Sequence, residues 1–346
     1  MMTRAQASGR HVLVTGGAGY VGSVLTGALL RQADHVTVVD KLLFGGDGIA
    51  GYRLHPRFHF AQADICEPGA IFDASMHSLA EGAPRISDVV HLAAIVGFPA
   101  CRAAGRAAVW RTNVEALQLV YEQANELGVH RFVFASTYSV YGKAQGEPVD
   151  EASALHPQSL YGESKIAGEE ILRGVSANNG CAPLILRFST IFGASPRMRF
   201  DLIVNQFVLE AFTRRQLILY QPRQARSFVH VQDLASGVIL GLQVPLEIIR
   251  GEIFNLGDES GNYTKDEIAG LICRALPETR LEYRDLMVDG DMRDVRVSFD
   301  RIRRGLGFKP QWTVEKGIAE IVDLLRRDEF PDPFARQYRN AQPVLE

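Results

Sequence analysis

The feature that most constrains the fold is a strand, a glycine-rich turn and a helix in immediate succession near the N-terminus. A short apolar run rich in valine spans residues 11–16, HVLVTG, and predicts a buried parallel strand. Gly16, Gly19 and Gly22 follow at GxxGxxG spacing and open a predicted helix over 21–32. Glycines let the backbone approach a phosphate, and the free N–H groups at a helix N-terminus favour an anion. The stretch therefore predicts an α/β sheet with a dinucleotide site.

The next predicted strand, HVTVVD at 35–40, ends in a carboxylate. Asp40 follows Gly22 by eighteen residues, where an acidic side chain can accept hydrogen bonds from adenosine ribose hydroxyls. The alternative role for Asp40 is that of a turn or cap residue. A carboxylate here disfavours a 2′-phosphate, so the expected cofactor is NAD rather than NADP. Lys41 opposes this preference, since its ammonium could pair with a phosphate.

Three further apolar strands continue the alternation of strand and helix, at 89–94, 131–136 and 183–189. Between the first two, residues 110–128 carry apolar side chains at helical spacing. Strands that alternate with helices in this way are typical of a parallel sheet covered on both faces. The expected fold class is α/β, with a doubly wound parallel Rossmann sheet.

From about residue 195 the alternation loosens into shorter, mixed signals. We therefore predict an NAD-binding Rossmann domain over 1–190 and a smaller C-terminal substrate-binding α/β lobe over 191–346. The chain is expected to return to the first sheet near 225–258, around Phe228 and Phe254.

Charge and composition favour a small-molecule partner. The net charge is −3 and the 37 lysines and arginines are scattered, so neither a nucleic acid nor a membrane surface is an expected partner. No apolar run is long enough for a membrane helix, and the N-terminal residues lack the apolar centre of a signal peptide. We expect a cytoplasmic protein. The four cysteines are widely separated, which favours buried thiols over a metal site or a disulfide.

A second motif, YGESK, places Tyr161 and Lys165 four residues apart on one face of a predicted helix. An ammonium beside a phenol stabilises the phenolate and lowers the phenol pKa, which creates an acid and base able to work near neutral pH. The motif alone also occurs by chance on exposed helices. It follows a predicted strand that ends in the hydroxyl-bearing stretch FASTYSVYG, over 134–142.

With these motifs in place the chain resembles the extended short-chain dehydrogenase/reductases, in particular their sugar-nucleotide epimerase and dehydratase branch, typified by UDP-glucose 4-epimerase. The resemblance covers almost the whole chain. The matching stretches are TGGAGYVG, ADI at 63–65, HLAA at 91–94, TN at 112–113, SVYG, YGESK, RSFVHVQDLA and DMRDVRVSFDRIRRGLGF.

The resemblance implies catalytic and cofactor-binding roles. Tyr161 would take a proton from a sugar hydroxyl, Lys165 would hold the nicotinamide ribose and lower the Tyr161 pKa, and Thr137 would bind the reacting oxygen. The implied cofactor-binding residues are Gly16, Gly19, Tyr20, Val21, Gly22, Asp40, Lys41, Asp64, Ile65, Leu92, Ala93, Ala94, Asn113, Ser136 and Lys165. Asn113 would also order the central helix, and packing is the alternative role for Asn113 and Ala94.

The implied partner is a nucleotide-diphosphate sugar. Arg226 and Arg293 match a diphosphate clamp, since guanidinium forks suit bidentate phosphate binding. The implied substrate-binding residues are Tyr138, Ser139, Thr190, Asn205, Arg226 and Arg293. Thr190 stands where the family usually has an asparagine. Arg197 and Arg199 are either close to the expected substrate cleft or exposed to solvent.

The absence of a carboxylate after Thr137 bears on the reaction. Dehydratases and decarboxylases of this family place an acidic residue at one of the next two positions, which here are Tyr138 and Ser139. The resemblance therefore favours NAD-dependent epimerisation at C4 through a 4-keto intermediate. The alternatives are a 4-ketoreductase, a dehydratase or decarboxylase in which Tyr138 takes an unusual role, and a non-catalytic cofactor-sensing protein. A homodimer is expected through helices at about 110–126 and 161–173.

Overall fold

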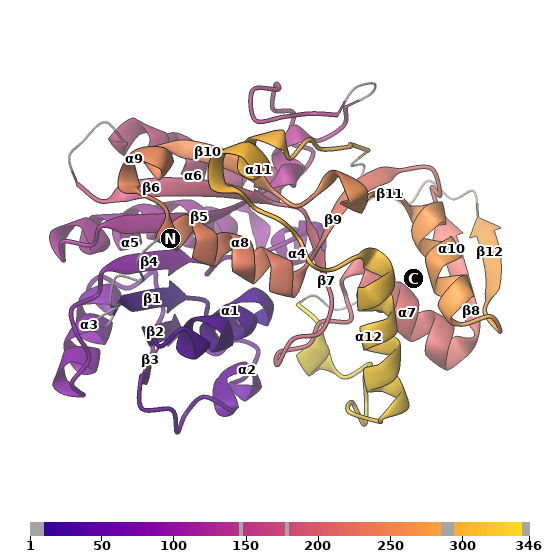
Figure 1. The fold of residues 1–346 in the computed structure, drawn as a ribbon, viewed down its shortest axis with the longest axis horizontal. Coiled ribbons are helices and arrows are strands. Elements are labelled where there is room, and N and C mark those ends of the chain that lie inside the picture. Colours follow the sequence, from indigo (N-terminus) through magenta and orange to yellow (C-terminus); the bar gives the residue numbers. More distant parts are fainter. Residues whose placement is uncertain (1–9, 145–147, 177–179, 285–293, 341–346) are drawn as a thin grey trace, which may run out of the picture.

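The computed structural model describes residues 10–144, 148–176, 180–284 and 294–340. Its main element is a sheet of seven strands in the order β10-β6-β5-β4-β1-β2-β3, which are stacked from top to bottom in Figure 1. All neighbouring strands are parallel. The strands are β1 (His11–Thr15), β2 (His35–Asp40), β3 (Phe58–Gln62), β4 (Asp88–His91), β5 (Arg131–Thr137), β6 (Ala182–Phe188) and β10 (Glu252–Leu256). The predicted doubly wound α/β fold is confirmed.

Helices pack on both faces of this sheet because successive strand residues point to opposite sides. Val12 and Val14 join a core with residues of α1 and α8, whereas Leu13 joins a second core with residues of α3 and α5. The helices of this part are α1 (Tyr20–Arg31), α2 (Asp47–Ala50), α3 (Ala70–Ala80), α4 (Phe98–Trp110), the π-helix η1 (Arg111–Glu115), α5 (Ala116–Glu126), the 3₁₀-helix η2 (Tyr138–Tyr141), α6 (Leu160–Val175), α8 (Val231–Gln243) and α9 (Leu246–Ile249).

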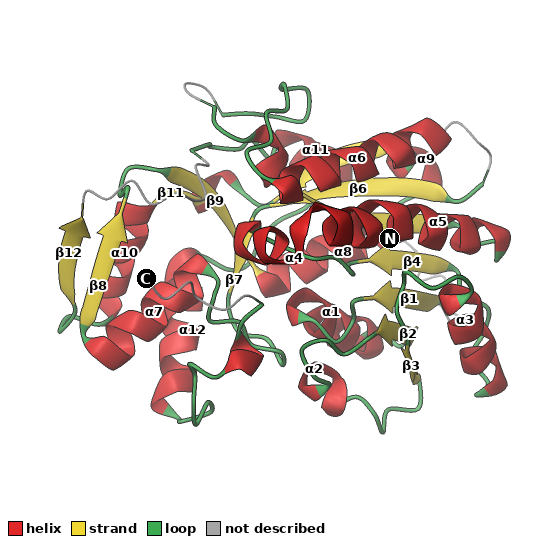
Figure 2. Ribbon diagram, turned by 180° about the vertical axis from the view of Figure 1, so that it is seen from behind, coloured by secondary structure: helices red, strands yellow, loops and turns green. Residues whose placement is uncertain are grey.

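A smaller lobe lies beside the carboxyl ends of the central strands, at the right of Figure 1 and the left of Figure 2. It contains a three-stranded sheet of β7 (Thr190–Phe192), β9 (Ala225–His230) and β11 (Asn262–Thr264), and a pair of β8 (Gln216–Tyr220) and β12 (Arg280–Arg284). Its helices are α7 (Ile203–Arg214), η3 (Glu259–Gly261), α10 (Lys265–Ala275), α12 (Val314–Arg326) and η4 (Arg336–Tyr338). The remaining helix, α11 (Asp300–Leu306), packs against β10 of the large sheet (Figure 1).

The predicted return of the chain to the large sheet is only half right. Phe254 lies in β10, which pairs with β6 in the large sheet. Phe228 lies in β9, which instead pairs with β7 and β11. The chain leaves the large sheet after β6, and β9 pairs with β7, the strand that directly follows β6, so only β10 returns to the large sheet.

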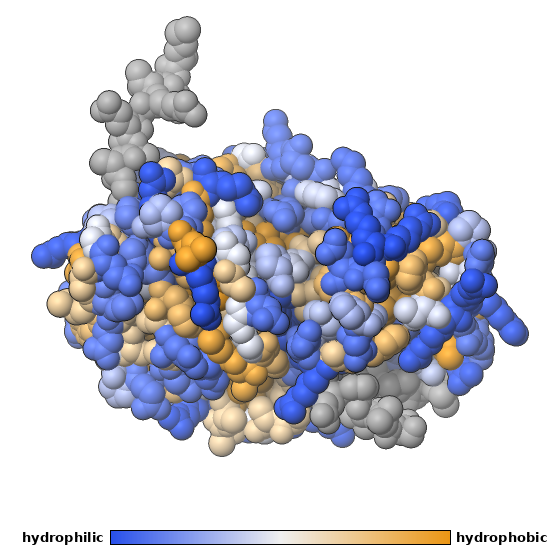
Figure 3. Space-filling model, turned by 90° about the horizontal axis from the view of Figure 1, so that it is seen from below, coloured by the Kyte–Doolittle hydropathy of each residue, from blue (hydrophilic) through white to orange (hydrophobic). Residues whose placement is uncertain are grey.

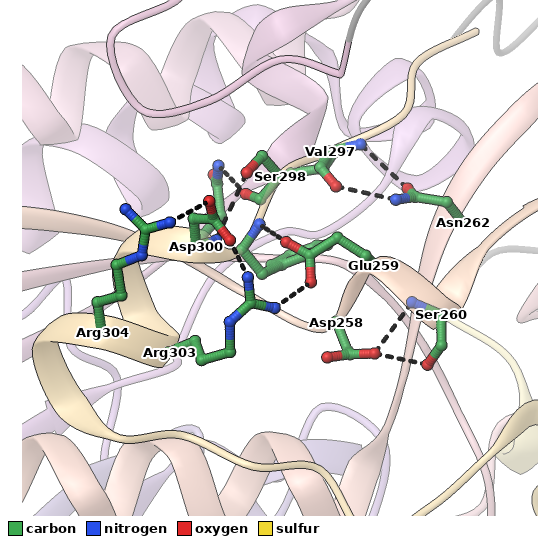
Figure 4. A network of polar contacts seen from close by, with 11 residues as sticks. Asp258, Glu259, Ser260, Asn262, Val297, Ser298, Asp300, Arg303 and Arg304 are labelled. Carbon is green, nitrogen blue, oxygen red and sulfur yellow. Dashed lines mark hydrogen bonds and ion pairs between the residues drawn. The ribbon is translucent and has the colours of Figure 1, made fainter.

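Polar contacts join η3 to the segment that opens α11 (Figure 4). Glu259 accepts hydrogen bonds from the backbone N–H of Phe299, at 2.7 Å, and from Arg303, at 2.8 Å. The side chain of Asn262 binds both the N–H and the carbonyl of Val297, at 3.0 and 2.9 Å. The described part of the DMRDVRVSFDRIRRGLGF stretch therefore has a structural role, fastening the chain between the two parts of the molecule.

Surface hydropathy and helix length bear on whether the described residues include a membrane span. Hydrophilic residues cover most of the face drawn in Figure 3, with hydrophobic residues in smaller patches. Among the residues that the structure describes, no helix combines the length and the apolar character needed to cross a bilayer.

Three histidines lie together at the amino end of the large sheet. The ring centroids of His11, His35 and His59 are 5.7 to 6.0 Å apart. His11 Nδ1 donates to the Pro84 carbonyl at 2.7 Å, and His11 Nε2 then accepts from the Thr37 hydroxyl at 2.7 Å. Burial lowers the pKa of His11 to about 4 and also lowers the pKa of His35. The neutral form of His11 is thus the one that the fold accommodates.

The free energy of unfolding is expected to fall as the pH drops from 6.5 to 4, because the His11 pKa is 6.5 in the unfolded chain and about 4 in the folded one. Each histidine that the fold keeps neutral adds up to ~1.4 kcal/mol per pH unit to the slope of the free energy of unfolding against pH. Urea unfolding of wild type and His11→Asn between pH 4 and 6.5 measures how the free energy of unfolding depends on pH. The difference between the two slopes is the contribution of His11. His156→Asn, at an exposed position, is the matched control. Equal slopes for wild type and His11→Asn would contradict the prediction.

Candidate functional site

The predicted site residues gather around one cleft between the large sheet and the smaller lobe. Its volume is about 380 Å³. The predicted residues that line it are Gly16, Gly19, Tyr20, Val21, Gly22, Asp40, Lys41, Asp64, Ile65, Leu92, Ala93, Ala94, Ser136, Thr137, Tyr138, Ser139, Tyr161, Lys165 and Thr190. They come from the carboxyl ends of parallel strands, the edge at which open α/β sheets bind ligands.

The glycine turn after β1 has no room for side chains. Gly16 has φ +71°, and a Cβ there would lie 2.7 Å from the Ala93 nitrogen. A Cβ on Gly22 would lie 2.3 Å from the Gly16 carbonyl oxygen. Helix α1 starts after Gly19, and no side chain of the described residues caps it. Its first N–H groups are therefore available to a phosphate.

Asp40 joins this turn to the loop after β2. Its two carboxylate oxygens accept hydrogen bonds from the N–H groups of Ala18, at 3.1 Å, and Leu42, at 2.8 Å. Asp40 therefore fills the turn role given as its alternative. Each oxygen has a second lone pair, so the carboxylate can still accept from a ribose hydroxyl.

Lys41 is paired within the protein. Its ammonium lies 3.1 Å from Asp64 Oδ2, and this partner helps to lower the pKa of the Asp64 carboxyl, against the effect of burial. An ammonium that already has a carboxylate partner is less available to a 2′-phosphate. The contact thus removes the main reason to expect NADP, which was that Lys41 could pair with a 2′-phosphate.

The YGESK motif forms the start of α6. Ser159 caps the helix by accepting from the Gly162 N–H at 3.2 Å, and Tyr161 lies in the first turn. Lys165 is buried, and its Nζ is 4.6 Å from the Phe134 ring centroid and 5.8 Å from the Tyr161 ring centroid. Burial lowers the pKa of Lys165 to about 8. The phenol therefore has an ammonium at its side whose charge is sensitive to mildly alkaline pH.

The hydroxyls at the end of β5 bind one another. Thr137 accepts from the Ser139 N–H at 3.1 Å and donates to the Ser139 hydroxyl at 3.0 Å, which starts the 3₁₀-helix η2. The Tyr138 hydroxyl lies 2.8 Å from Thr190 Oγ1, and the Tyr138 side chain is buried. The two positions at which the sequence departs from the family pattern therefore contact each other.

A buried ion pair supports the same strand end. Ser136 donates to the carboxylate of Glu169, one turn after Lys165. Arg187 binds Glu169 through Nε, at 3.0 Å, and Nη2, at 2.6 Å, and donates through Nη1 to the Tyr141 hydroxyl at 2.9 Å. Sequence reasoning did not identify this network, because the residue types give no signal until β5, β6 and α6 are side by side.

Four predicted residues remain, of which Asn113, Asn205 and Arg226 do not line the cleft. Asn113 acts through its neighbours. Asn113, in the π-helix, binds the N–H and the carbonyl of Ile95, at 2.8 and 2.9 Å, and the Ser164 hydroxyl at 3.1 Å. Ser164 in turn donates to the Tyr161 carbonyl at 2.8 Å. Asn113 thus links the loop after β4 to the helix that carries Tyr161.

The other three were predicted to bind substrate. Asn205 is fully buried, and its amide binds the Gly193 N–H at 3.0 Å and the Arg199 carbonyl at 2.9 Å. Asn205 therefore organises the loop after β7 and does not itself line the cleft. Arg226 is buried on β9 and does not line the cleft. Arg293 lies outside the described residues.

Several residues of the cleft were missed or left undecided. Arg197 and Arg199 both line it, and Arg197 is only 5% exposed, so the solvent-exposed alternative is wrong for Arg197. Phe44 and Asn340 also line the cleft. The SPRMR stretch was the available signal for the arginines, whereas nothing in the sequence around Asn340 indicates a site.

The cleft fits a dinucleotide: it offers an uncapped helix N-terminus, a turn without side chains and a carboxylate for a ribose. The comparisons agree. The chain is 32% identical over 256 residues to the uncharacterised UDP-glucose epimerase YtcB of Bacillus subtilis (strain 168), covering 71% of this chain and 76% of that protein. It is 30% identical over 330 residues to the dTDP-glucose 4,6-dehydratase of Streptomyces griseus, covering 90% and 93%.

Among solved structures, DesIV, the dTDP-glucose 4,6-dehydratase of Streptomyces venezuelae with NAD bound, has a TM-score of 0.78 and 28% identity. The match covers 92% of this chain and 98% of that one. The model of the NAD dependent epimerase/dehydratase family matches residues 12–257. The chain therefore belongs to the NAD dependent epimerase/dehydratase family, and NAD is its cofactor.

Proposed function

We propose that the protein epimerises a nucleotide-diphosphate hexose at C4 through a 4-keto intermediate. The observation that carries the proposal is the placement of carboxylates. Of the described residues that line the cleft, only Asp40 and Asp64 carry one. Asp40 ends β2 and Asp64 follows β3, and β1 and β4 separate these strands from β5, which leads to Tyr138. The cleft wall around Tyr161 is thus lined by hydroxyls and an ammonium, and none of the described residues that line it there carries a carboxylate.

The chain's own residues hold and move the proton. Tyr161, as phenolate, would take the proton of the sugar 4-hydroxyl and return it to the oxygen after the sugar has turned over. Lys165 stabilises the phenolate by its charge, and the Thr137 hydroxyl can bind the reacting oxygen. When bound, NAD would supply the capacity to accept a hydride from C4 and return it, so that the net reaction would be an isomerisation.

Elimination of water places a further demand on the site, because an acid must donate a proton to the leaving hydroxyl. Tyr138 and Ser139 occupy the positions where the resemblance leads one to expect that acid. The Tyr138 hydroxyl is engaged with Thr190 and the Ser139 hydroxyl accepts from Thr137. This arrangement favours epimerisation over dehydration, although both kinds of enzyme occur among the relatives.

The test is incubation of the purified protein with UDP-, GDP-, CDP- and dTDP-sugars in D₂O, with products analysed by mass spectrometry and NMR. C4 epimerisation should give a product of unchanged mass, inverted only at C4, with no deuterium on carbon because the hydride returns. Loss of water or carbon dioxide would overturn the proposal. Turnover only of a keto-sugar with added NAD(P)H would establish a ketoreductase, and no turnover across the panel would favour a cofactor-sensing protein.

The rate is expected to depend on the charge of Lys165. Its pKa is lowered to about 8, so the ammonium is present below that pH and is lost above it. We expect kcat/KM to fall as the pH rises, roughly fivefold between pH 8 and 9 for one titrating group. Lys165→Arg should remove this fall over the same range, since a guanidinium stays charged. An alkaline fall that is identical in both proteins would assign it to another group.

A further inference from the structure

Arg197 is a buried cation with two guanidinium nitrogens that find no hydrogen-bond acceptor in the described part of the chain. It lies in the segment between β7 and α7, and 5% of its surface is exposed. Its Nε and Nη2 find no acceptor among the described residues. A buried guanidinium without a hydrogen-bonded counter-charge costs folding free energy, so such a group is expected to meet an anion in the working protein.

The other cations that line the cleft have either a carboxylate partner or a place in the proposed mechanism. The described residues that line it include Lys41, Lys165, Arg197 and Arg199. Lys41 pairs with Asp64 at 3.1 Å, and Arg199 binds Asp201 through two nitrogens, each at 2.9 Å. Lys165 lies over aromatic rings beside the assigned acid and base. The fourth cation is therefore the one for which a ligand must supply the anion.

Contacts place Arg197 on the cofactor side of the cleft. Its Cζ lies 4.5 Å from the ring centroid of Phe44, in the loop after β2. A Cβ added to Gly48 would lie 2.9 Å from the Arg197 Cβ. Its backbone N–H donates to Ser195 Oγ at 3.3 Å, and that hydroxyl donates to the Tyr20 carbonyl, in the first turn of α1, at 2.7 Å.

We propose that Arg197 binds the diphosphate of NAD, together with the N-terminus of α1. A guanidinium can form two parallel hydrogen bonds to phosphate oxygens, which the backbone N–H groups of α1 cannot supply from their side. The segment 195–199 belongs to the smaller lobe, so this contact fastens that lobe onto the cofactor. The inference depends on the cofactor alone, and it holds or fails whatever reaction the enzyme catalyses.

Burial lowers the pKa of Arg197 to about 10, which leaves the side chain charged at neutral pH and in need of an anion. This predicts opposite effects of one substitution. Arg197→Met keeps much of the length of the side chain over Phe44 and removes the charge. The cofactor-free variant should therefore melt at the same temperature as wild type or higher, whereas the stabilisation that NAD gives should be smaller.

Calorimetric titration of cofactor-free protein with NAD, NADP, ADP and adenosine identifies the phosphate. In Arg197→Met the Kd for NAD and for ADP should rise about 10- to 100-fold, the value of one charge-assisted contact, while the Kd for adenosine should not change. Arg197→Lys should lie between wild type and Arg197→Met. Arg326→Met, which removes an exposed arginine, should match wild type in every titration.

Other outcomes would overturn the assignment. Loss of affinity for NADP alone would place Arg197 at a ribose 2′-phosphate. Equal loss for adenosine, or a lower melting temperature of the cofactor-free Arg197→Met protein, would make the residue a structural one. Unchanged affinity for ADP would show that the diphosphate is bound elsewhere. Each outcome can be read without any assay of C4 epimerisation.

Discussion

Replacing Tyr161 with phenylalanine is expected to lower turnover by about 10²- to 10⁴-fold, the usual contribution of a positioned acid and base. The variant lacks only the hydroxyl oxygen that would carry the proton. The phenyl ring that remains can keep the packing beside Lys165, so the fold and NAD binding should be preserved. Product formation by mass spectrometry and bound NAD in the denatured supernatant measure the two effects separately.

Tyr138→Phe is the matched comparison, because it removes a hydroxyl from the neighbouring tyrosine of the same cleft. That hydroxyl is bound to Thr190, so its loss should cost at most a few-fold in turnover. A loss in Tyr138→Phe as large as that in Tyr161→Phe would show that Tyr138 takes part in proton transfer. Wild-type turnover in Tyr161→Phe would remove the assigned role altogether.

Glu169→Ala is expected to destabilise the protein by about 3–5 kcal/mol, the cost of leaving one partner of a buried ion pair alone. Both side chains are 3% exposed, and Arg187 binds the carboxylate through two nitrogens. Without Glu169 the guanidinium would keep only the Tyr141 hydroxyl as a described partner. Urea unfolding at pH 7 measures the loss, provided that the transition stays two-state.

The double variant Glu169→Met, Arg187→Met is the control for this prediction. It removes both charges and fills much of the same volume, so it should be more stable than Glu169→Ala. A double variant whose loss equals the sum of the losses in Glu169→Met and in Arg187→Met would mean that the pair does not act as a unit. The comparison also tests the support of β5, since Ser136 donates to the same carboxylate.

The features that could be predicted from the sequence are those with a local physical signature. β1, β2 and α1 follow from valine-rich runs and glycine spacing, and the Tyr161–Lys165 pair follows from helical periodicity. β3 was missed because FHFAQ is short and has two polar residues in five. The division at residue 190, the homodimer and the cytoplasmic location stay predictions.

The rest of the site depends on contacts between distant segments. Asn340 reaches the cleft because its backbone N–H binds Asp201, which lies 139 positions earlier, at 2.9 Å. Asn205 was predicted to bind substrate from a match to a family motif, which fixes a position along the chain. Only the fold shows which backbone groups the Asn205 side-chain amide binds. Arg197 could be named from its motif, but only the fold shows that it is buried and has no acceptor among the described residues.

The hydrogen bond between Tyr138 and Thr190 makes the two positions evolutionarily interdependent. Either residue changed alone leaves the other hydroxyl, which lines the cleft, without this hydrogen-bond partner, a cost that a simultaneous exchange avoids. A series of single mutations from this site to one with an acid after Thr137 therefore passes through a less favourable intermediate unless both positions change together. Attempts to install dehydratase chemistry by directed evolution should accordingly randomise the two codons jointly, since libraries that vary one at a time would discard the productive combination.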